Sequence, residues 1–228
     1  MTIKSWFTFL MESEPPKKKL KKVWIMDESK CLTRNEVRKL RGFCESERTN
    51  GLKQGKFTPV RNWFMVELGL NTGLRVNEMA TLNHSNLIIE GERSSIFVIG
   101  KGKKPRSIWI NSEFKMTCQK YFQYKKRFGY RTDPQAFLLN NLSGEKISKR
   151  ALQKFFKQIL ENSALPLRYH IHSLRHTYAT FLLEASNNNY RFVQSQLGHA
   201  SIKTTGVYAG VVETVGRKAI EKLYKERG

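Results

Sequence analysis

Acidic residues and long apolar runs are what this chain of 228 residues has least of. It carries 19 Asp and Glu residues against 41 Lys and Arg residues, which gives a formal net charge of +22. Such an excess raises the local concentration of polyanions and favours nucleic acid or an anionic membrane as the partner. No apolar run approaches ~18 residues, so the sequence predicts no membrane-spanning helix.

Cysteine is also scarce. Cys31, Cys44 and Cys118 are odd in number and lack the spacing of a metal site. This usage is typical of a reducing compartment in which thiols stay free. The apolar stretch from Trp6 to Met11 is short, is followed by acidic residues and lacks a small-residue cleavage pattern, so no signal peptide is expected. These features predict a cytoplasmic protein.

The rest of the composition is that of a globular protein, with 39% hydrophobic and 11% aromatic residues. Residues 1–30 differ, because Pro15-Pro16 is followed by the basic run Lys17-Lys18-Lys19-Leu20-Lys21-Lys22. Proline followed by like charges resists packing, so we expect residues 1–30 to form a flexible basic arm or linker that contacts phosphate. Residues 31–228 are expected to form the folded domain.

Helix signals recur along residues 31–228. A capping box from Thr33 to Glu36 opens the first helix. An apolar helix that starts at Thr58, with Pro59 in its first position, is expected to form the core and to end at Gly73. Further helices are expected from Leu74, from Ser112 to Phe128 with Lys125 facing outward, from Lys149 to Asn162 behind the cap Ser148, after Ser173 as N-cap, and over 211–226.

Alternating and β-branched runs lie between these helices, at Leu87–Ile89, Ile96–Ile99 and Ser107–Ile110. They predict a small antiparallel sheet whose last hairpin has a cationic tip. In that tip Lys101 stands between two glycines, which lets its backbone approach a ligand closely, although a solvated turn is the alternative. The expected fold class is α+β, mainly α-helical with a small antiparallel β-sheet.

The stretch from His170 to Tyr208 carries the clearest functional signal. His172 and Arg175 lie three residues apart at a helix start, near the positive end of the helix dipole, where a phosphate is favoured. Gly198 allows a sharp helix end, so His199 can turn back toward the same site. Taken singly, these residues could equally be a surface arginine, a turn and a core histidine.

Arg75 stands at a second predicted helix start, directly after the turn at Gly73. It is therefore a second guanidinium that could face an anion. The alternative is an ion pair with Glu78 three residues on, which is a common and nearly neutral surface feature.

A metal site is the other interpretation of His170, His172, His176 and His199, since His172 and His176 form an i, i+4 pair. The residue after His172 is a serine rather than the glutamate of a metalloprotease helix. No carboxylate lies nearby in sequence, and Arg175 would repel a cation. We therefore expect neither a metal nor another cofactor.

Five short motifs follow one another along residues 31–228: Gly73-Leu74-Arg75-Val76-Asn77-Glu78, Gly100-Lys101-Gly102, His172-Ser173-Leu174-Arg175-His176-Thr177, Leu197-Gly198-His199 and Tyr208. Together they resemble the catalytic domain of the tyrosine recombinases, the phage integrase and Xer family, with its DNA breaking-rejoining enzyme fold. Each motif alone is weak. Five in family order, with compatible secondary structure between them, are poorly explained by coincidence.

The resemblance implies that Tyr208 is the nucleophile. It would attack a DNA phosphodiester and leave a 3′-phosphotyrosyl bond and a free 5′-hydroxyl. Arg75 and Arg175 would hold the non-bridging phosphate oxygens, as planar guanidinium donors can do in pairs.

Three further site residues are implied by the same resemblance. Lys101 would protonate the leaving 5′-oxygen, while His172 and His199 would transfer protons and hydrogen-bond to the phosphate. No metal or nucleotide is required, because the bond energy is kept in the phosphotyrosine.

The implied function is site-specific recombination of double-stranded DNA through a Holliday junction. The implied assembly is a homo-tetramer on two DNA sites, associated with the nucleoid through its DNA, with the C-terminal helix exchanged between protomers. The alternatives are a type IB topoisomerase and a catalytically silent DNA-binding regulator, although the intact set of six residues argues against the latter. Residues 1–30 are too short for the helical core-binding domain that usually comes first, so the chain is either a catalytic-domain-only member or a piece of a longer protein.

Overall fold

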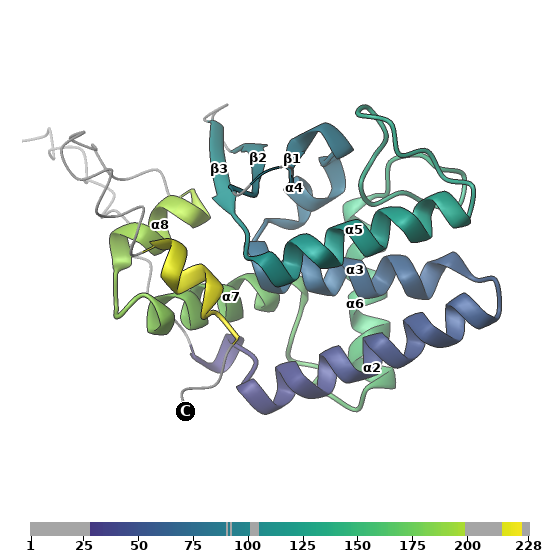
Figure 1. Ribbon diagram of the computed structural model, residues 1–228. Coiled ribbons are helices and arrows are strands. Elements are labelled where there is room, and N and C mark those ends of the chain that lie inside the picture. Colours follow the sequence, from purple (N-terminus) through teal and green to yellow (C-terminus); the bar gives the residue numbers. More distant parts are fainter. Residues whose placement is uncertain (1–27, 90, 92, 101–104, 199–215, 225–228) are drawn as a thin grey trace, which may run out of the picture.

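The computed structural model describes residues 28–89, 91, 93–100, 105–198 and 216–224 of the protein. Helices make up most of these residues, with one small sheet at the edge of the helical body (Figure 1). In chain order the elements are the 3₁₀ helix η1 (Glu28–Lys30), α2 (Arg34–Lys53), α3 (Phe57–Thr72), α4 (Val76–Thr81), the 3₁₀ helix η2 (His84–Asn86), β1 (Leu87–Ile88), β2 (Ser95–Ile99), β3 (Pro105–Trp109), α5 (Ser112–Arg127), α6 (Lys149–Asn162), α7 (Ile171–Ala185) and α8 (Tyr190–Leu197).

Helix α3 is the centre of the fold, as its apolar sequence predicted. It lies between α2 and α5 (Figure 1) and also packs against α6 and α7. Its buried face includes Phe64, whose ring stacks on Tyr121 of α5 with 3.9 Å between the ring centroids. Such burial of large apolar side chains contributes roughly 1.5–3 kcal/mol for each one. The chain segments that enter and leave α3 are thereby fixed in space.

The sheet has the order β1-β2-β3, and both pairings are antiparallel. Ile96 of β2 lies between Leu87 of β1 and Ile108 of β3 on the buried face. Val98 and Arg106 pair on the same face, so Arg106 is directed toward the helices. The sequence therefore predicted the class of the fold correctly, with a mainly helical body and a small antiparallel sheet.

Several helix starts follow the sequence signals closely, whereas two do not. The capping box of Thr33 and Glu36 opens α2, and Ser148 caps α6. The predicted start of the core helix at Thr58 is wrong, because the helix begins at Phe57, with Lys56 as N-cap. The prediction that Ser173 is an N-cap is also wrong, because His170 is the N-cap of that helix.

Helix α7 begins at Ile171, and His170 is its N-cap. Ser173 instead occupies the third helical position, where its hydroxyl accepts a hydrogen bond from the His170 backbone N–H at 3.3 Å. The hydroxyl therefore stabilises the helix start from inside the first turn. This shift places His172 and Arg175 one turn deeper into the helix than expected.

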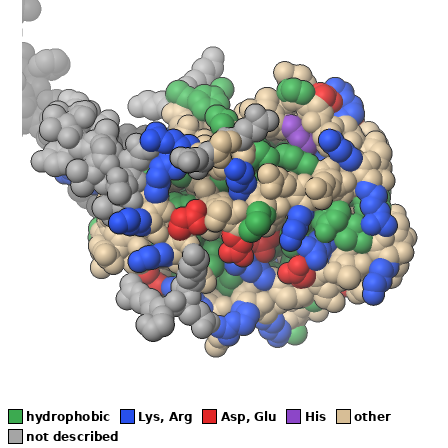
Figure 2. Space-filling view, viewed as in Figure 1, with side chains coloured by type: hydrophobic (Ala, Val, Ile, Leu, Met, Phe, Trp, Pro, Cys, Tyr) green, Lys and Arg blue, Asp and Glu red, His purple; other side chains and the backbone are tan. Residues whose placement is uncertain are grey.

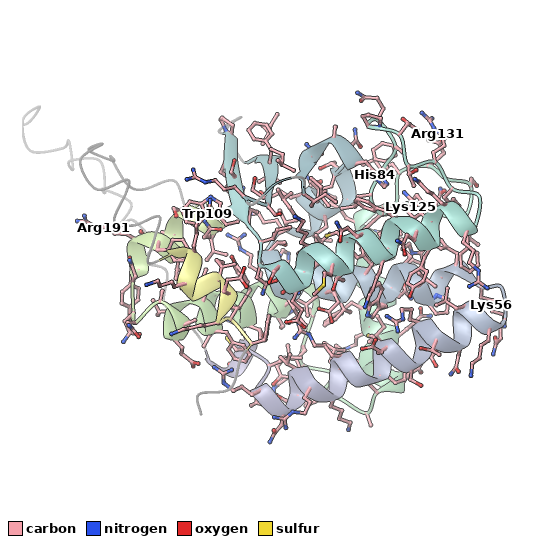
Figure 3. The ribbon with its side chains drawn as sticks, viewed as in Figure 1. Lys56, His84, Trp109, Lys125, Arg131 and Arg191 are labelled. Atoms are coloured by element: carbon pink, nitrogen blue, oxygen red, sulfur yellow. The ribbon has the colours of Figure 1, made fainter. Side chains whose placement is uncertain are left out.

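The expectation that Lys125 faces outward is wrong. Its side chain is 1% exposed, and its Nζ donates to the Phe137 carbonyl at 2.6 Å and lies 3.1 Å from His84 Nε2 (Figure 3). Burial lowers the pKa of Lys125 to about 8. Burial and the Lys125 charge lower the pKa of His84 to about 4. The imidazole is therefore neutral near pH 7 and can accept a hydrogen bond from the ammonium.

The C-terminal segment, residues 216–224, packs on its own chain. Its side chains Ala219, Ile220 and Leu223 are at most 3% exposed, and the Tyr224 hydroxyl donates to the Leu70 carbonyl. Arg41 lies over the Tyr224 ring, 4.0 Å from its centroid. This arrangement differs from the expected docking on a neighbouring protomer, because the end of α3 and the adjacent helices already provide an apolar site.

No helix in the described part of the chain is both long and apolar enough to cross a membrane. The expected basic arm, residues 1–30, lies almost entirely outside that part, which begins at residue 28.

Candidate active site

The structure describes three of the six predicted site residues: Arg75, His172 and Arg175. Lys101, His199 and Tyr208 lie outside the described residues. The described part of the site is formed by α3, α4, α7, α8 and β3.

Gly73 brings the start of α4 close to α7 and α8. It ends α3 in the left-handed conformation, with φ of 58°. A Cβ at this position would lie 2.5 Å from Tyr178 Cδ1 and 2.9 Å from Leu197 Cδ2, so glycine is required for both conformation and space. Arg75 follows two residues later as the N-cap of α4. The close approach thus places this arginine beside the helix that carries Arg175.

Glu78 holds Arg75 in two ways. One carboxylate oxygen, Oε2, accepts the Arg75 backbone N–H at 2.8 Å, and the other, Oε1, accepts Nη1 of the Arg75 guanidinium at 3.1 Å. The ion pair that was the alternative role for Arg75 is therefore present, but it is not a surface pair, because the Glu78 side chain is only 8% exposed. A buried carboxylate fixes both the backbone and the side chain of Arg75.

A third arginine completes the contacts of Glu78. Arg106 of β3 donates from Nη1 and Nη2 to the two carboxylate oxygens, each at 3.0 Å. Burial raises the pKa of Glu78, but the hydrogen bonds from Arg106 and from the Arg75 N–H outweigh it and hold the pKa below its usual range. Glu78 is therefore ionised at neutral pH.

Arg175 is held by backbone carbonyls at the ends of two other helices. Its Nη1 donates to the Gly73 carbonyl at 2.6 Å, and its Nη2 donates to the Leu197 carbonyl at 2.9 Å. Carbonyls at helix C-termini carry partial negative charge and suit a cation. Burial and the neighbouring Arg75 lower the pKa of Arg175 to about 9. The guanidinium remains positive at neutral pH, in an environment that favours the arrival of an anion.

The electrostatic balance of this cluster is positive. Arg75, Arg106 and Arg175 act on one another, and Glu78 is the carboxylate that opposes them. Three guanidinium groups against one carboxylate leave two positive charges in a partly buried site. A phosphodiester carries one negative charge and two non-bridging oxygens, which suit a pair of guanidinium groups.

His172 lies at the edge of this cluster. It is half-buried, and burial, His170, Arg175 and Arg75 all lower its pKa. Its imidazole is therefore neutral at pH 7 and able to accept a proton. His172 therefore lies near enough to Arg175 and Arg75 for their charges to act on its imidazole.

The histidines on this face do not form a ligand cluster with one another in the described residues. The rings of His170 and His172 lie 6.0 Å apart between centroids, in a T-shaped arrangement. No group of three or more His, Cys, Asp or Glu side chains in this part of the chain is arranged to hold a metal ion.

Sequence reasoning did not identify Arg106 or Gln196 as parts of the site. Arg106 was counted only as part of a cationic hairpin, and Gln196 carries no charge. The signal was nevertheless present, since β-strand alternation puts Arg106 on the same face as Ile108, which faces the core. A buried arginine needs a partner such as a carboxylate, but the sequence does not indicate that this partner is Glu78 rather than another acidic residue.

The side-chain types on one face of the molecule agree with this charge balance. Lys and Arg side chains are spread over the face in Figure 2, while Asp and Glu side chains gather in a few places. This distribution presents a largely positive surface to a polyanion.

Comparison with known proteins identifies relatives of this chain. Residues 30–214 match the profile of the phage integrase family. Tyrosine recombinase XerC of Chlamydia caviae is 33% identical over 169 residues, which are 74% of this chain and 53% of XerC. The chain spans about half the length of the curated relatives it matches.

Two solved structures share the fold. The XerH site-specific recombinase bound to its difH substrate superimposes with a TM-score of 0.60 at 21% identity, covering 87% of this chain and 50% of XerH. The integrase from mycobacterium phage Brujita also gives a TM-score of 0.60, at 19% identity, covering 98% of this chain and 70% of the integrase. The family profile covers most of the chain, and the motifs, the fold and the arginine cluster agree with it. The chain therefore belongs to the phage integrase family, the tyrosine recombinases.

Proposed function

We propose that this chain catalyses site-specific recombination of double-stranded DNA. The observation that carries the proposal is the convergence of Arg75 and Arg175 from separate helices on one positively charged, partly buried site, with a neutral His172 beside them. Such a site suits a phosphodiester. Family membership and the net charge of +22 support DNA as the source of that phosphodiester.

In this proposal Arg75 and Arg175 hold the two non-bridging oxygens of the scissile phosphate. Charge accumulates on these oxygens as the phosphorus becomes pentavalent, so donors that are already in place stabilise the transition state most. Glu78 and the carbonyls of Gly73 and Leu197 hold the guanidinium groups before DNA arrives. The two arginines should therefore contribute mainly to the rate of cleavage.

The remaining roles follow from the family motifs. Tyr208 attacks the phosphorus, a 3′-phosphotyrosyl bond forms, and the bond to the 5′-oxygen breaks. Lys101 gives a proton to that leaving oxygen, and His172 and His199 hydrogen-bond to the phosphate and accept or return protons. A 5′-hydroxyl from a second DNA site then reverses the attack, and strand exchange proceeds through a Holliday junction.

The functions named for the relatives favour this function over its alternatives. XerH is described as a site-specific recombinase bound to difH, and the curated relatives are named tyrosine recombinases. A type IB topoisomerase would use similar chemistry but relax DNA alone and without a defined site. A silent DNA-binding regulator would not need the preorganised pair of arginines.

We further propose that the active assembly is a homo-tetramer on two DNA sites. Residues 31–228 would be its catalytic domain, and residues 1–30 a basic arm that contacts DNA. Residues 216–224 dock on their own chain here, and each protomer has the same apolar site. Exchange of this segment between protomers would replace one set of contacts by an identical set, so it requires little net free energy.

The direct test combines cleavage with recombination. The protein is incubated in EDTA with short nicked duplexes from a fragment library, and covalent protein–DNA adducts are isolated and sequenced. A plasmid that carries two copies of the recovered site is then scored for exchanged strands. The proposal predicts adducts at one sequence, in EDTA, followed by recombination. Adducts at random sequences would favour a topoisomerase, and DNA binding without any adduct would favour the regulator.

A further inference from the structure

Arg106 is joined to two parts of the candidate active site at once. Its guanidinium makes the paired contact with Glu78, and its Nε donates to the Gln196 carbonyl at 3.2 Å. The side chain is 10% exposed. Glu78 in turn holds Arg75, while Gln196 immediately precedes Leu197, whose carbonyl holds Arg175. One side chain therefore connects the supports of both arginines.

The turn after α8 is fitted closely to the same side chain. Gly198 ends α8 with φ of 67°, and a Cβ there would lie 2.6 Å from Cδ and 2.8 Å from Nε of Arg106. Gly198 thus packs directly against the side chain of Arg106. Any change in the position of Arg106 would alter this turn.

Strand β3 is tied to the end of α8 by a second contact. The Trp109 backbone N–H donates to Gln196 Oε1 at 2.9 Å, and Trp109 lies beside α8 (Figure 3). Gln196 is 3% exposed, so these contacts are shielded from water. Because β3 begins at Pro105, it directly follows the segment that carries Lys101. Strand β3 therefore contacts both Glu78, through Arg106, and the end of α8, through Arg106 and the Trp109 backbone.

We propose that Arg106 is a positioning residue for cleavage, which sets the geometry of Arg75 through Glu78 and the geometry of Leu197 and Gly198 at the end of α8 through Gln196. This inference rests on the proposed function for its effect on rate. Arg106 itself need not touch DNA. Lysine cannot replace it fully, because an ammonium cannot give two parallel hydrogen bonds to a carboxylate and a third to a carbonyl in a fixed plane.

The test compares Arg106→Gln and Arg106→Lys with a matched control, Arg48→Gln. Arg48 is also partly buried, at 15% exposure, and pairs with Glu45 on α2. All variants are assayed below their melting temperatures for DNA affinity and for single-turnover adduct formation at saturating nicked DNA. We expect Arg106→Gln to slow adduct formation by roughly 10²-fold, as small misplacements of catalytic groups do, with DNA affinity nearly unchanged. Arg106→Lys should recover part of the rate, and Arg48→Gln should retain all of it.

A second measurement does not depend on activity. In the DNA-free protein, the guanidinium Nε–Hε signals of Arg75 and Arg175 are followed by NMR with labelled arginine. Arg106→Gln should shift or broaden both signals, and Arg48→Gln should leave them in place. Unchanged signals together with an unchanged cleavage rate would overturn the inference while leaving the proposed function intact. Absence of any adduct from the unsubstituted protein would instead contradict the proposed function, and the NMR result would still decide the role of Arg106.

Discussion

At the scale of single residues, two charged side chains, Glu78 and Lys125, are buried in the folded chain. Glu78 and Lys125 both lie on amphipathic helices where charged residues usually face water, yet the exposed fractions are 8% and 1%. Burial of each charge is tolerated because its polar atoms have hydrogen-bond partners. The partners of Glu78 are arginines, and those of Lys125 are a backbone carbonyl and an imidazole. These buried groups make stability depend on pH.

His84 provides a pH prediction. Its pKa is about 4 in the folded chain and about 6.5 when unfolded, so the unfolded chain binds the extra proton between these values. The free energy of unfolding should therefore fall as pH falls from 6.5 to 4, with His84 contributing on the order of 1–2 kcal/mol. Thermal unfolding of the protein and of His84→Gln across this range measures the contribution.

Glutamine keeps an acceptor for Lys125 but cannot take up the proton. The difference in melting temperature between the two proteins should therefore shrink or reverse toward pH 4. Other histidines and carboxylates titrate in both proteins and cancel in that difference. A constant difference across the range would show that His84 is not the group being protonated.

The sequence could predict part of the site at this scale. Arg75, His172 and Arg175 could be proposed from the sequence because their motifs are local, although the predicted start of α7 is three residues too late. The contact of Arg106 with Glu78 and the burial of Lys125 could not be predicted, since both depend on which element packs opposite. Hydrophobic periodicity predicts on which face of an element a residue lies. It does not predict that a neighbouring element supplies a carboxylate or a carbonyl as its hydrogen-bond partner.

At the scale of elements, the ends of α3 and α8 determine where the arginines lie. Both helices end in a left-handed glycine, Gly73 and Gly198, and both supply the last carbonyls that hold Arg175. The positions of these glycines in the sequence predicted that they end helices. The close contacts that they permit with Tyr178, Leu197 and Arg106 required the structure.

Gly198→Ala tests this role, with Gly55→Ala as its control. The two glycines have nearly equal φ, 67° and 68°, but a Cβ at Gly55 would meet no atom within 4 Å. Both changes should cost about 1 kcal/mol for the left-handed conformation. Only Gly198→Ala should cost more than this and slow adduct formation, because its Cβ would displace Arg106. Denaturant unfolding and single-turnover cleavage supply the two measurements, and equal effects of the two variants would rule out the crowding.

At the scale of the whole molecule, the question is whether the C-terminal segment packs on its own chain or on a neighbouring protomer. The family resemblance favoured docking on a neighbour, whereas the amphipathic pattern without that resemblance favoured docking on the same chain as an ordinary core helix. In the described part of the segment, Ala219, Ile220 and Leu223 are buried in the same chain, and the segment contacts α3, the N-cap of α5 and α7. Periodicity predicts that a face is buried, but not by which copy of the protein.

Leu223→Ala distinguishes the two arrangements in the absence of DNA. Leu223 is 1% exposed, so its truncation should lower the free energy of unfolding by roughly 2–5 kcal/mol even at dilute, monomeric concentrations. Leu142→Ala is the control, since Leu142 is 69% exposed and its loss should have little effect. If Leu223→Ala leaves unfolding unchanged in the monomer and weakens only the assembly on DNA, the segment docks on a neighbour in solution.

The central claim is that Tyr208 forms the covalent bond to DNA, and peptide mapping of the adduct tests it most directly. The adduct formed on nicked DNA in EDTA is digested with protease and nuclease, and the modified peptide is sequenced by mass spectrometry. Tyr208→Phe and Tyr190→Phe are run in parallel, because Tyr190 is a 60% exposed tyrosine at the start of α8. We expect a nucleotide joined through its 3′-phosphate to the Tyr208 hydroxyl. Tyr208→Phe should form no adduct at nearly unchanged DNA affinity, and Tyr190→Phe should form a normal amount of adduct. An adduct that persists in Tyr208→Phe, or that maps to another residue, would contradict the account.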